Sequence, residues 1–242
     1  MRRSRVYTPQ QLLPSGNLEL EGSAAHYLLR VLRLSAGDPV TLFNGDGSDY
    51  QGEICQVERQ CVVVRIIGSK IPGNESSLKI TLVQAISRGE RMDYSLQKAT
   101  ELGVFCVQPV TSSRVEVRLD EKRQTKRLAH WQGVVASACE QSGRAVVPIV
   151  RTPLSLCEWL SSTEGSPRLV LDPLAATRLS GLVLNGDAVS ILVGPEGGFS
   201  AQEIEEVHTN GIRAVSLGPR VLRTETAGPA AISVLQAIAG DL

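Results

Sequence analysis

The sequence predicts an α/β protein in two parts, a small β-rich domain at residues 1–70 and a larger domain with a parallel sheet at residues 78–242. The first observation is a change of pattern, from short strand-like runs to an alternation of strand-like and helix-like segments. The second is that turns rich in glycine and proline follow successive strand-like runs of the larger part. The third is that 242 residues, 42% of them hydrophobic, suffice for one large domain or two modest domains with a buried core.

The first part has the pattern of a small β-rich barrel. Residues 41–54 contain two strand-like runs around a turn of Gly and Asp, and residues 61–67 form an apolar run rich in β-branched side chains. We expect one helix, around residues 24–32, to interrupt these strands. The stretch IPGNESS at residues 71–77 has the composition of a linker.

The second part alternates in the way that predicts a parallel sheet with helices on both faces. We expect helices over residues 90–102 and 120–141, and a third helix opened by the capping box Ser200–Glu203. Residues 226–240 are the least charged long segment, but are too short for a membrane-spanning helix, so we expect a buried terminal helix. The strand-like runs are 78–86, 104–110, 146–150, 168–172, 188–193 and 213–218.

The charge of the chain sums to zero, from 25 basic and 25 acidic residues, which argues against a protein that binds through bulk positive charge. The sum hides a separation of charge. Residues 78–150 carry 11 basic and 7 acidic side chains, a net +4, and residues 151–242 carry 6 and 10, a net −4. The basic run at 114–127 is either a solvated helix face or a patch that binds phosphate.

The five cysteines form no C-x-x-C pair and no cluster with the spacing of a zinc site, so we expect reduced thiols, no metal and a cytoplasmic location. The basic start of the chain is not followed by an apolar stretch of the kind that a secretory signal contains. The three histidines are dispersed, and no serine-histidine-aspartate arrangement is evident.

The most informative loop follows the strand that ends at Val193. Its glycines, in Gly194–Gly198, allow positive φ and let backbone amides approach a ligand. The loop lacks both the G-x-G-x-x-G dinucleotide fingerprint and the G-K-[ST] of a P-loop. Taken alone, it is either a ligand loop or a tight strand-to-helix turn.

A second loop begins where the strand ending at Leu217 meets Gly218, and continues with Val221, Leu222 and Arg223. Its apolar side chains are suited to hold a flat ring, although an ordinary set of loop salt bridges is the alternative. Ligands of open α/β sheets bind beyond the carboxyl ends of the strands. We therefore expect both loops to line one pocket, together with the strand end at Leu171 and Asp172.

A third polar turn, CEQSGR at residues 139–144, contains Glu140 and Arg144. On its residues alone, a helix C-cap at Gly143 explains it better than catalysis does.

Four motifs together resemble one family. SRGERMDYSLQKATELGV, ACEQSGRAVVP, LVGPEGGFSAQEI and SLGPRVLRTETA resemble the bacterial small-subunit (16S) ribosomal RNA uridine N3-methyltransferases of the SPOUT superfamily. Arg5, His26 and the VLR at 31–33 resemble the family's N-terminal motifs. The resemblance implies a PUA-like β-barrel at 1–70 that binds RNA, and a SPOUT methyltransferase domain with a trefoil knot at 78–242. It also implies a homodimer.

The resemblance further implies S-adenosylmethionine as cofactor and 16S rRNA, within the small ribosomal subunit, as partner. The implied cofactor contacts are Leu171, Asp172, Val193, Gly194, Pro195, Glu196, Gly197, Leu217, Gly218, Val221 and Leu222. The arginines expected to contact RNA, chiefly at phosphate, are Arg5, Arg30, Arg33, Arg88, Arg114 and Arg144.

The implied reaction moves a methyl group from a sulfonium to N3 of a uridine, and it needs no metal. Because N3 lies on the Watson–Crick edge, the base has to be unpaired or extruded. We expect Arg223 to stabilise the developing uracil oxyanion, and Glu196 to orient either Arg223 or the cofactor amine. Glu140 and Glu225 are the candidates for a base.

Three other functions stay open. A non-enzymatic RNA-binding factor would leave the two Gly-Pro loops unexplained, and a nicotinamide oxidoreductase would lack its glycine fingerprint. Methylation of a ribose or of another base is the third. The sequence does not define which uridine is modified, or whether naked RNA or an assembled subunit is the substrate.

Overall fold

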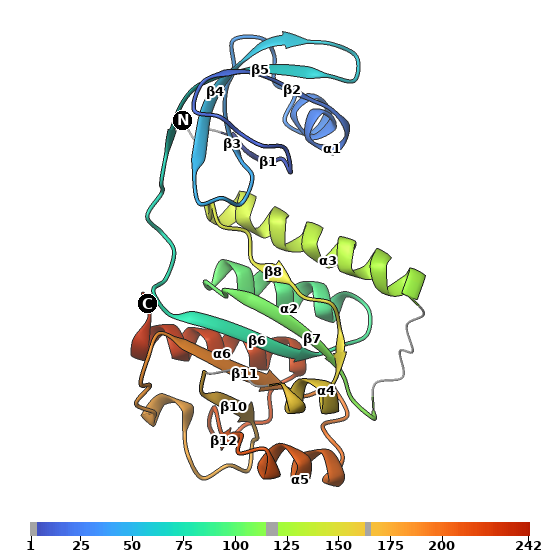
Figure 1. The fold of residues 1–242 in the computed structure, drawn as a ribbon, viewed down its shortest axis with the longest axis vertical. Coiled ribbons are helices and arrows are strands. Elements are labelled where there is room, and N and C mark those ends of the chain that lie inside the picture. Colours follow the sequence, from blue (N-terminus) through green and yellow to red (C-terminus); the bar gives the residue numbers. More distant parts are fainter. Residues whose placement is uncertain (1–3, 115–120, 163–165) are drawn as a thin grey trace. The chain divides into compact units, whose positions relative to one another are not determined.

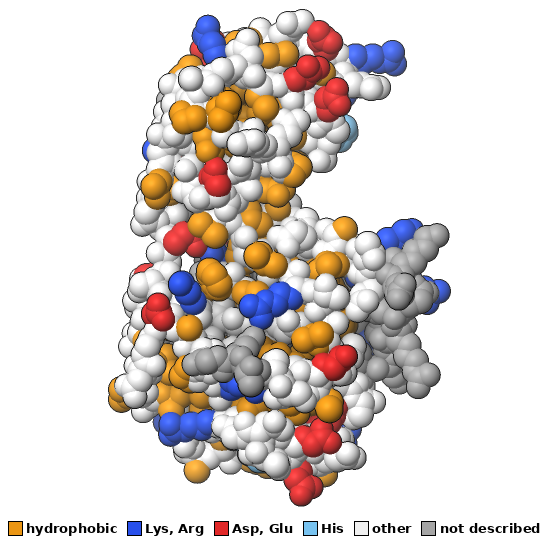
Figure 2. All heavy atoms as spheres, in the orientation of Figure 1, with side chains coloured by type: hydrophobic (Ala, Val, Ile, Leu, Met, Phe, Trp, Pro, Cys, Tyr) orange, Lys and Arg blue, Asp and Glu red, His pale blue; other side chains and the backbone are white. Residues whose placement is uncertain are grey.

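The computed structural model describes residues 4–114, 121–162 and 166–242 (Figure 1). The chain forms two compact units, one of Met1–Glu75 with Ala136–Val147 and the other of Ser76–Val135 with Pro148–Leu242. Part of the basic run at 114–127 and the arginines at positions 2 and 3 lie outside the described residues. Positive and negative side chains are interspersed on the face shown in Figure 2.

The first unit contains a five-stranded sheet of order β1-β3-β4-β5-β2, in which only the β1–β3 pair is parallel. The expected hairpin at 41–54 is present as β3 and β4. The expected helix around 24–32 is present as an α-helical turn followed by a π-helical turn. The elements are β1 (Ser4–Tyr7), β2 (Gly16–Leu20), α1 (Gly22–His26), η1 (Tyr27–Val31), β3 (Pro39–Phe43), β4 (Asp49–Val57) and β5 (Val62–Lys70).

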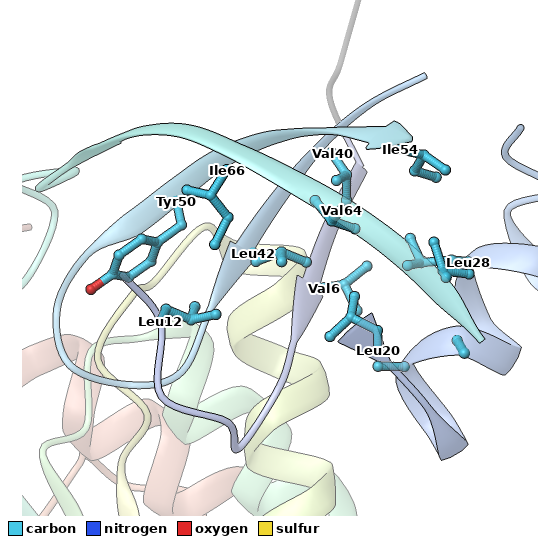
Figure 3. Packing of buried hydrophobic residues seen from close by; sticks show 13 residues of the cluster. Val6, Leu12, Leu20, Leu28, Val40, Leu42, Tyr50, Ile54, Val64 and Ile66 are labelled. Carbon is cyan, nitrogen blue, oxygen red and sulfur yellow. The ribbon is translucent and has the colours of Figure 1, made fainter. Parts of the chain in front are cut away.

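One side of this sheet is covered by its own helical segment and by the loop before β2 (Figure 3). Val6, Leu42 and Val64 project from three strands into a cluster that also contains Leu28 and Leu12. Alternate strand residues thus form a core, as the period-2 pattern of a half-buried strand requires. Among the described residues no pairing joins β1 to β2, so the strand ladder is an open one.

Residues 136–147 pack with the first unit, although the sequence pattern places them in the second domain. The reason is local. The last turns of α3 (Glu121–Ser142) carry the small buried residues Ala138 and Cys139, and Gly47 donates a backbone hydrogen bond to the carbonyl of Ala145. Sequence periodicity does not show which unit such a surface meets.

The second unit contains a seven-stranded sheet in which every pairing is parallel, as predicted. Its order is β12-β10-β11-β6-β7-β8, with β9 also paired to β7. The strands are β6 (Lys79–Ala85), β7 (Cys106–Thr111), β8 (Ile149–Val150), β9 (Leu154–Ser155), β10 (Arg168–Leu171), β11 (Ala188–Val193) and β12 (Arg213–Val215). The helices are α2 (Glu90–Glu101), α3, α4 (Leu156–Ser161), η2 (Leu179–Gly181), α5 (Ala201–Thr209) and α6 (Thr224–Ala239).

Helices cover both faces of this sheet, and the central strand β6 shows how. Val83 and Ala85 belong to a cluster that contains Trp159 of α4 and Val207 of α5. Leu82, which points the other way, has its side chain 3.3 Å from the position that a Cβ on Gly228 of α6 would take. Successive residues of one strand thus face opposite helix layers.

The expected terminal helix is α6, which is buried along one side and packs against α2, β6 and β11. Within the described chain, no helix is both long enough and apolar enough to cross a membrane.

Candidate functional site

A cavity of about 590 Å³ lies in the second unit at the carboxyl ends of β10, β11 and β12. Parallel neighbouring strands bring the loops that follow them to one edge of a sheet. Every residue predicted as a cofactor contact lines this cavity, as does Arg223. These residues are Leu171, Asp172, Val193, Gly194, Pro195, Glu196, Gly197, Leu217, Gly218, Val221 and Leu222. The structure brings them together, and their binding of a cofactor stays a prediction.

The Gly-rich loop packs tightly at its first residue. A Cβ built on Gly194 would lie 3.2 Å from the Phe199 ring, closer than an ordinary contact. Gly198 adopts a φ of +66°, which favours glycine, and its amide donates to the carbonyl of Pro195. Ser200 then opens α5 with the predicted capping box, which Glu203 completes. The loop is thus a tight strand-to-helix turn and a wall of the cavity at the same time.

A buried hydrogen-bond chain fixes this loop to the sheet and to α6. Thr224 Oγ1 donates to the carbonyl oxygen of Gly194 at 2.7 Å. The same hydroxyl accepts from Gln84 Nε2 of β6 at 3.0 Å. Gln84 is fully buried, and Thr224 is 7% exposed. The start of α6 is therefore tied to the first residue of the Gly-rich loop.

The loop after β12 contributes the apolar side of the cavity. Gly218 has a φ of +125°, so the chain turns there in a conformation that L side chains rarely adopt. Val221 follows with 82% of its surface exposed, and Leu222 is half-buried. A large, exposed apolar side chain at the rim of a cavity is suited to cover a flat ligand.

Arg91, in the first turn of α2, is a cavity residue that the sequence analysis missed. Its Nη1 lies 2.9 Å from Glu196 Oε1, and its Nε lies 3.9 Å from Glu225 Oε1. Glu196 was expected to orient Arg223 or a cofactor amine, and its arginine partner here is Arg91 instead. No spacing rule joins a residue of α2 to a loop more than a hundred positions later.

The carboxyl of Glu196 is held in its ionised form. Burial opposes ionisation, but hydrogen bonds from its own amide, the Arg91 side chain and the Arg88 amide outweigh it and lower the pKa of Glu196. Glu225 differs, because its Oε2 is shielded from solvent and has no hydrogen-bond partner among the described residues.

Glu203 is a second residue that the sequence analysis assigned only to a helix cap. Its carboxylate also accepts from the amide of Ser113 at 2.6 Å and from Ser113 Oγ at 2.9 Å. The next residue, Arg114, lines the cavity and donates from Nη1 to the carbonyl of Gly197 at 2.6 Å. Glu203 thus ties the segment that carries Arg114 to the helix after the Gly-rich loop.

The arginines predicted to contact RNA fall into two groups. Arg30 and Arg33 of the first unit and Arg88 and Arg114 of the second are exposed. Arg33 has a φ of +55°, the one positive φ of a non-glycine residue in the described chain, and lies two residues after the end of the π-helical turn. Such strain and π-turns are found preferentially at functional sites.

Arg5 and Arg144 have partners within the first unit instead. The Arg5 guanidinium lies 2.5 Å from Asp49 Oδ1, donates to the carbonyl of Cys139 and stacks over Phe43. Arg144 is 4% exposed and is paired with Glu75. These contacts give both side chains a structural role, and RNA contact by either stays a prediction.

Glu140 also lies in the first unit and is not among the cavity-lining residues. Its Oε1 accepts a hydrogen bond from the amide of Tyr7 at 2.8 Å. Burial raises its pKa, against the opposing effects of the Tyr7 amide and Arg5. Glu140 therefore has a hydrogen-bond partner within the first unit, and its catalytic role stays a prediction.

A parallel α/β unit with a ligand-sized cavity at its strand ends, joined to a small β unit, defines the class of the protein. Residues 74–236 match a family model described as an RNA methyltransferase domain, and residues 20–67 match an RNA methyltransferase PUA domain. The chain belongs to this family of RNA methyltransferases.

Individual relatives match over the whole chain. The ribosomal RNA small subunit methyltransferase E of Buchnera aphidicola subsp. Schizaphis graminum is 35% identical, covering 100% of this chain and 98% of its own. The structure of the enzyme of that name from Neisseria gonorrhoeae, bound to S-adenosylmethionine, is 39% identical with a TM-score of 0.93. A Legionella pneumophila protein in complex with the same cofactor is 40% identical with a TM-score of 0.96. Both structures cover 100% of both chains.

Glu203→Gln should lower the free energy of unfolding in a pH-dependent way. Hydrogen bonds from Ser200 and Ser113 outweigh burial and lower the pKa of Glu203 below its ordinary 4.5. A lowered pKa contributes stability above the unfolded-state value, and the contribution is lost as the pH falls through the folded-state value. We expect a loss of about 1–3 kcal/mol at pH 7 and a smaller loss at pH 4, measured by chemical denaturation. Two results would contradict this role of Glu203. One is an equal loss of unfolding free energy at both pH values, and the other is an equally large loss in the exposed control Glu205→Gln.

Arg5→Ala should destabilise the first unit, because it leaves Asp49 buried without its partner. Breaking a buried pair from one side costs about 3–5 kcal/mol, whereas the exposed Arg30→Ala should change stability by less than about 0.5 kcal/mol. Scanning calorimetry of the two variants measures the difference. If the two variants were equally stable, the buried contacts of Arg5 would contribute nothing to the free energy of unfolding.

Proposed function

We propose that the protein uses S-adenosylmethionine to methylate N3 of a uridine in 16S rRNA. The observation that carries the proposal is that three strand-end loops and Arg223 meet in one cavity. The relatives support it, since two structures of the same fold hold this cofactor and one of them is named for small-subunit rRNA methylation.

The residues of the cavity fit the cofactor. Val193, Leu217 and Leu222 offer apolar walls for an adenine ring. The carboxylate of Glu196 suits a ligand that carries a sulfonium and an ammonium group.

The bound cofactor supplies an electrophilic methyl carbon, and the chain positions the base and handles the charge on it. The guanidinium of Arg223 donates to a uracil carbonyl oxygen as negative charge develops there. Arg223 is exposed at the rim and precedes the first turn of α6. The Thr224 hydroxyl holds that end of the helix to the Gly-rich loop.

We also propose that the second unit contains the trefoil knot of the SPOUT superfamily. The chain at the end of β12 is bonded on both sides by one segment. Val215 accepts from the amide of Asp172, while Ser216 exchanges backbone hydrogen bonds with Thr177 and Leu179. Residues 172–179 thus bond to both sides of the end of β12. This arrangement supports a knot, in which one part of the chain passes through a loop formed by another part. Knots are rare exceptions to chain topology.

The remaining parts of the proposal rest on the resemblance. We propose functional domains at 1–70 and 78–242 with the linker 71–77, a cytoplasmic homodimer, and 16S rRNA within the small subunit as partner. The family matches at 20–67 and 74–236 support the division.

The exposed arginines of both units support RNA contact, because each can pair with two phosphate oxygens. These arginines are Arg30, Arg33, Arg88 and Arg114.

The function is tested by incubating the protein with labelled S-adenosylmethionine and either naked 16S rRNA or small subunits, and then mapping the modified nucleotide. We expect label on N3 of one uridine. Label on a ribose, on another base, or on neither substrate would overturn the proposal.

Gly194→Val should weaken the binding of S-adenosylmethionine at least tenfold. The added side chain meets the Phe199 ring and displaces the loop at the point held by Thr224. Gly133→Ala is the control, because a Cβ at this helical position meets nothing within 4 Å. Calorimetric titration of both variants measures the affinity, and an unchanged value for Gly194→Val would make the loop purely structural.

Arg223→Ala should lower turnover by about 10²–10³-fold, the usual effect of removing a donor to a developing oxyanion. Cofactor affinity should stay within a few-fold, because the side chain acts on the base. Single-turnover methylation and calorimetry separate the two effects. Normal turnover would remove Arg223 from the mechanism.

A further inference from the structure

Among the described residues, Glu225 is the one carboxylate of the cavity with a buried oxygen that lacks a hydrogen-bond partner. It lies in the first turn of α6, one residue after the Thr224 that bonds to the Gly-rich loop. Its side chain is 16% exposed, its Oε1 lies 3.9 Å from Arg91 Nε, and its Oε2 is buried without a partner. By contrast, Glu196 Oε1 already accepts from Arg91 and from the Arg88 amide.

A buried acceptor without a donor costs free energy, so its presence in a site is explained if a ligand brings the donor. The terminal torsion of glutamate is broad and roughly two-fold, so rotation presents either oxygen to the cavity. Arg223, two positions earlier in the chain, lines the same cavity and offers N–H donors. The start of α6 therefore pairs an acceptor with a donor.

That pair complements the imide edge of uracil when the carboxylate faces N3. The Watson–Crick edge of uracil presents a carbonyl acceptor, the N3–H donor and a second carbonyl acceptor. The same edge of cytosine presents an amino donor and then an N3 acceptor. With the carboxylate at N3 and the guanidinium at a neighbouring carbonyl, the pair matches uracil, whereas cytosine has an acceptor at N3 and offers the carboxylate no proton.

We propose that Glu225 accepts the N3 proton of the substrate uracil while Arg223 binds a carbonyl next to that nitrogen. The proposal rests on the proposed function and names Glu225 as a catalytic residue that also selects the base. Arg91, which lies beside Glu225 Oε1 and is bonded to Glu196, is a positioning residue for this carboxylate.

The step balances without a further reactant. The N3–H bond breaks and its proton moves to the Glu225 carboxylate. The nitrogen electron pair forms the new bond to the methyl carbon, and the carbon–sulfur bond breaks with its electrons left on sulfur. The products are N3-methyluridine and S-adenosylhomocysteine, and the protonated Glu225 returns its proton to water.

The experiment compares full-length wild type, Glu225→Gln and the exposed control Glu205→Gln in single-turnover methylation of the substrate found for the wild type. We expect Glu225→Gln to be slower by about 10²-fold or more at pH 7, the effect of losing a general base. At pH 9.5 the deficit should shrink at least tenfold, because alkaline solution removes the N3 proton without the carboxylate. Calorimetric affinity for S-adenosylmethionine should stay within threefold, and Glu205→Gln should match the wild type.

Each other outcome overturns the inference. Turnover equal to wild type removes Glu225 from the reaction. A deficit of equal size at both pH values makes the side chain a hydrogen-bonding or structural group, and a tenfold loss of cofactor affinity makes it a ligand of the cofactor amine. A wild-type protein that leaves uridine N3 unmethylated refutes the proposed function instead, so the two failures are distinguishable.

Discussion

The site depends on the hydroxyl of Thr224. It donates to the carbonyl of Gly194 and accepts from Gln84, so one buried side chain joins the central strand β6, the Gly-rich loop after β11 and the start of α6. Arg223 and Glu225 flank Thr224 in the chain, and both line the cavity. The position of the proposed catalytic groups relative to the proposed cofactor loop is therefore fixed by a hydrogen bond inside the core.

The charged side chains near Thr224 form pairs of opposite charge. Arg91 lies between Glu196 and Glu225, and Arg114 is bonded to the Gly-rich loop while Glu203 holds the residue before it. Hydrogen bonds from its own amide, Arg91 and Arg88 lower the pKa of Glu196, which suits a cavity proposed to receive a cationic cofactor. Glu225 differs, because its Oε2 is buried without a hydrogen-bond partner among the described residues.

Much of this architecture follows from the sequence. The alternation of strands and helices predicted the parallel sheet, and the rule that ligands bind at carboxyl ends of strands brought Leu171, Gly194 and Leu217 to one cavity. The capping box at Ser200 was predicted from spacing alone. These features depend on local patterns or on a general rule of topology.

The features that could not be predicted from the sequence depend on contacts between residues far apart in the chain. Arg91 meets Glu196 across more than a hundred residues, and Arg5 meets Asp49 inside the first unit, where an RNA contact had been expected. An arginine that pairs inside the protein and one that faces solvent look alike in a sequence. The packing of residues 136–147 with the first unit was missed for the same reason, because α3 belongs to both units.

The most direct test of the account is the affinity of Thr224→Val for S-adenosylmethionine, measured by calorimetry beside Thr224→Ser. Valine keeps the shape of threonine but removes both hydrogen bonds, leaving the Gly194 carbonyl and one N–H of the Gln84 side chain unmatched at about 1–3 kcal/mol each, while Gln84 keeps its bond to the Ala85 carbonyl. We predict a folded Thr224→Val protein that binds the cofactor at least tenfold more weakly, and a Thr224→Ser protein within threefold of wild type. A folded Thr224→Val protein with wild-type affinity would contradict the central claim that this hydroxyl holds the site together.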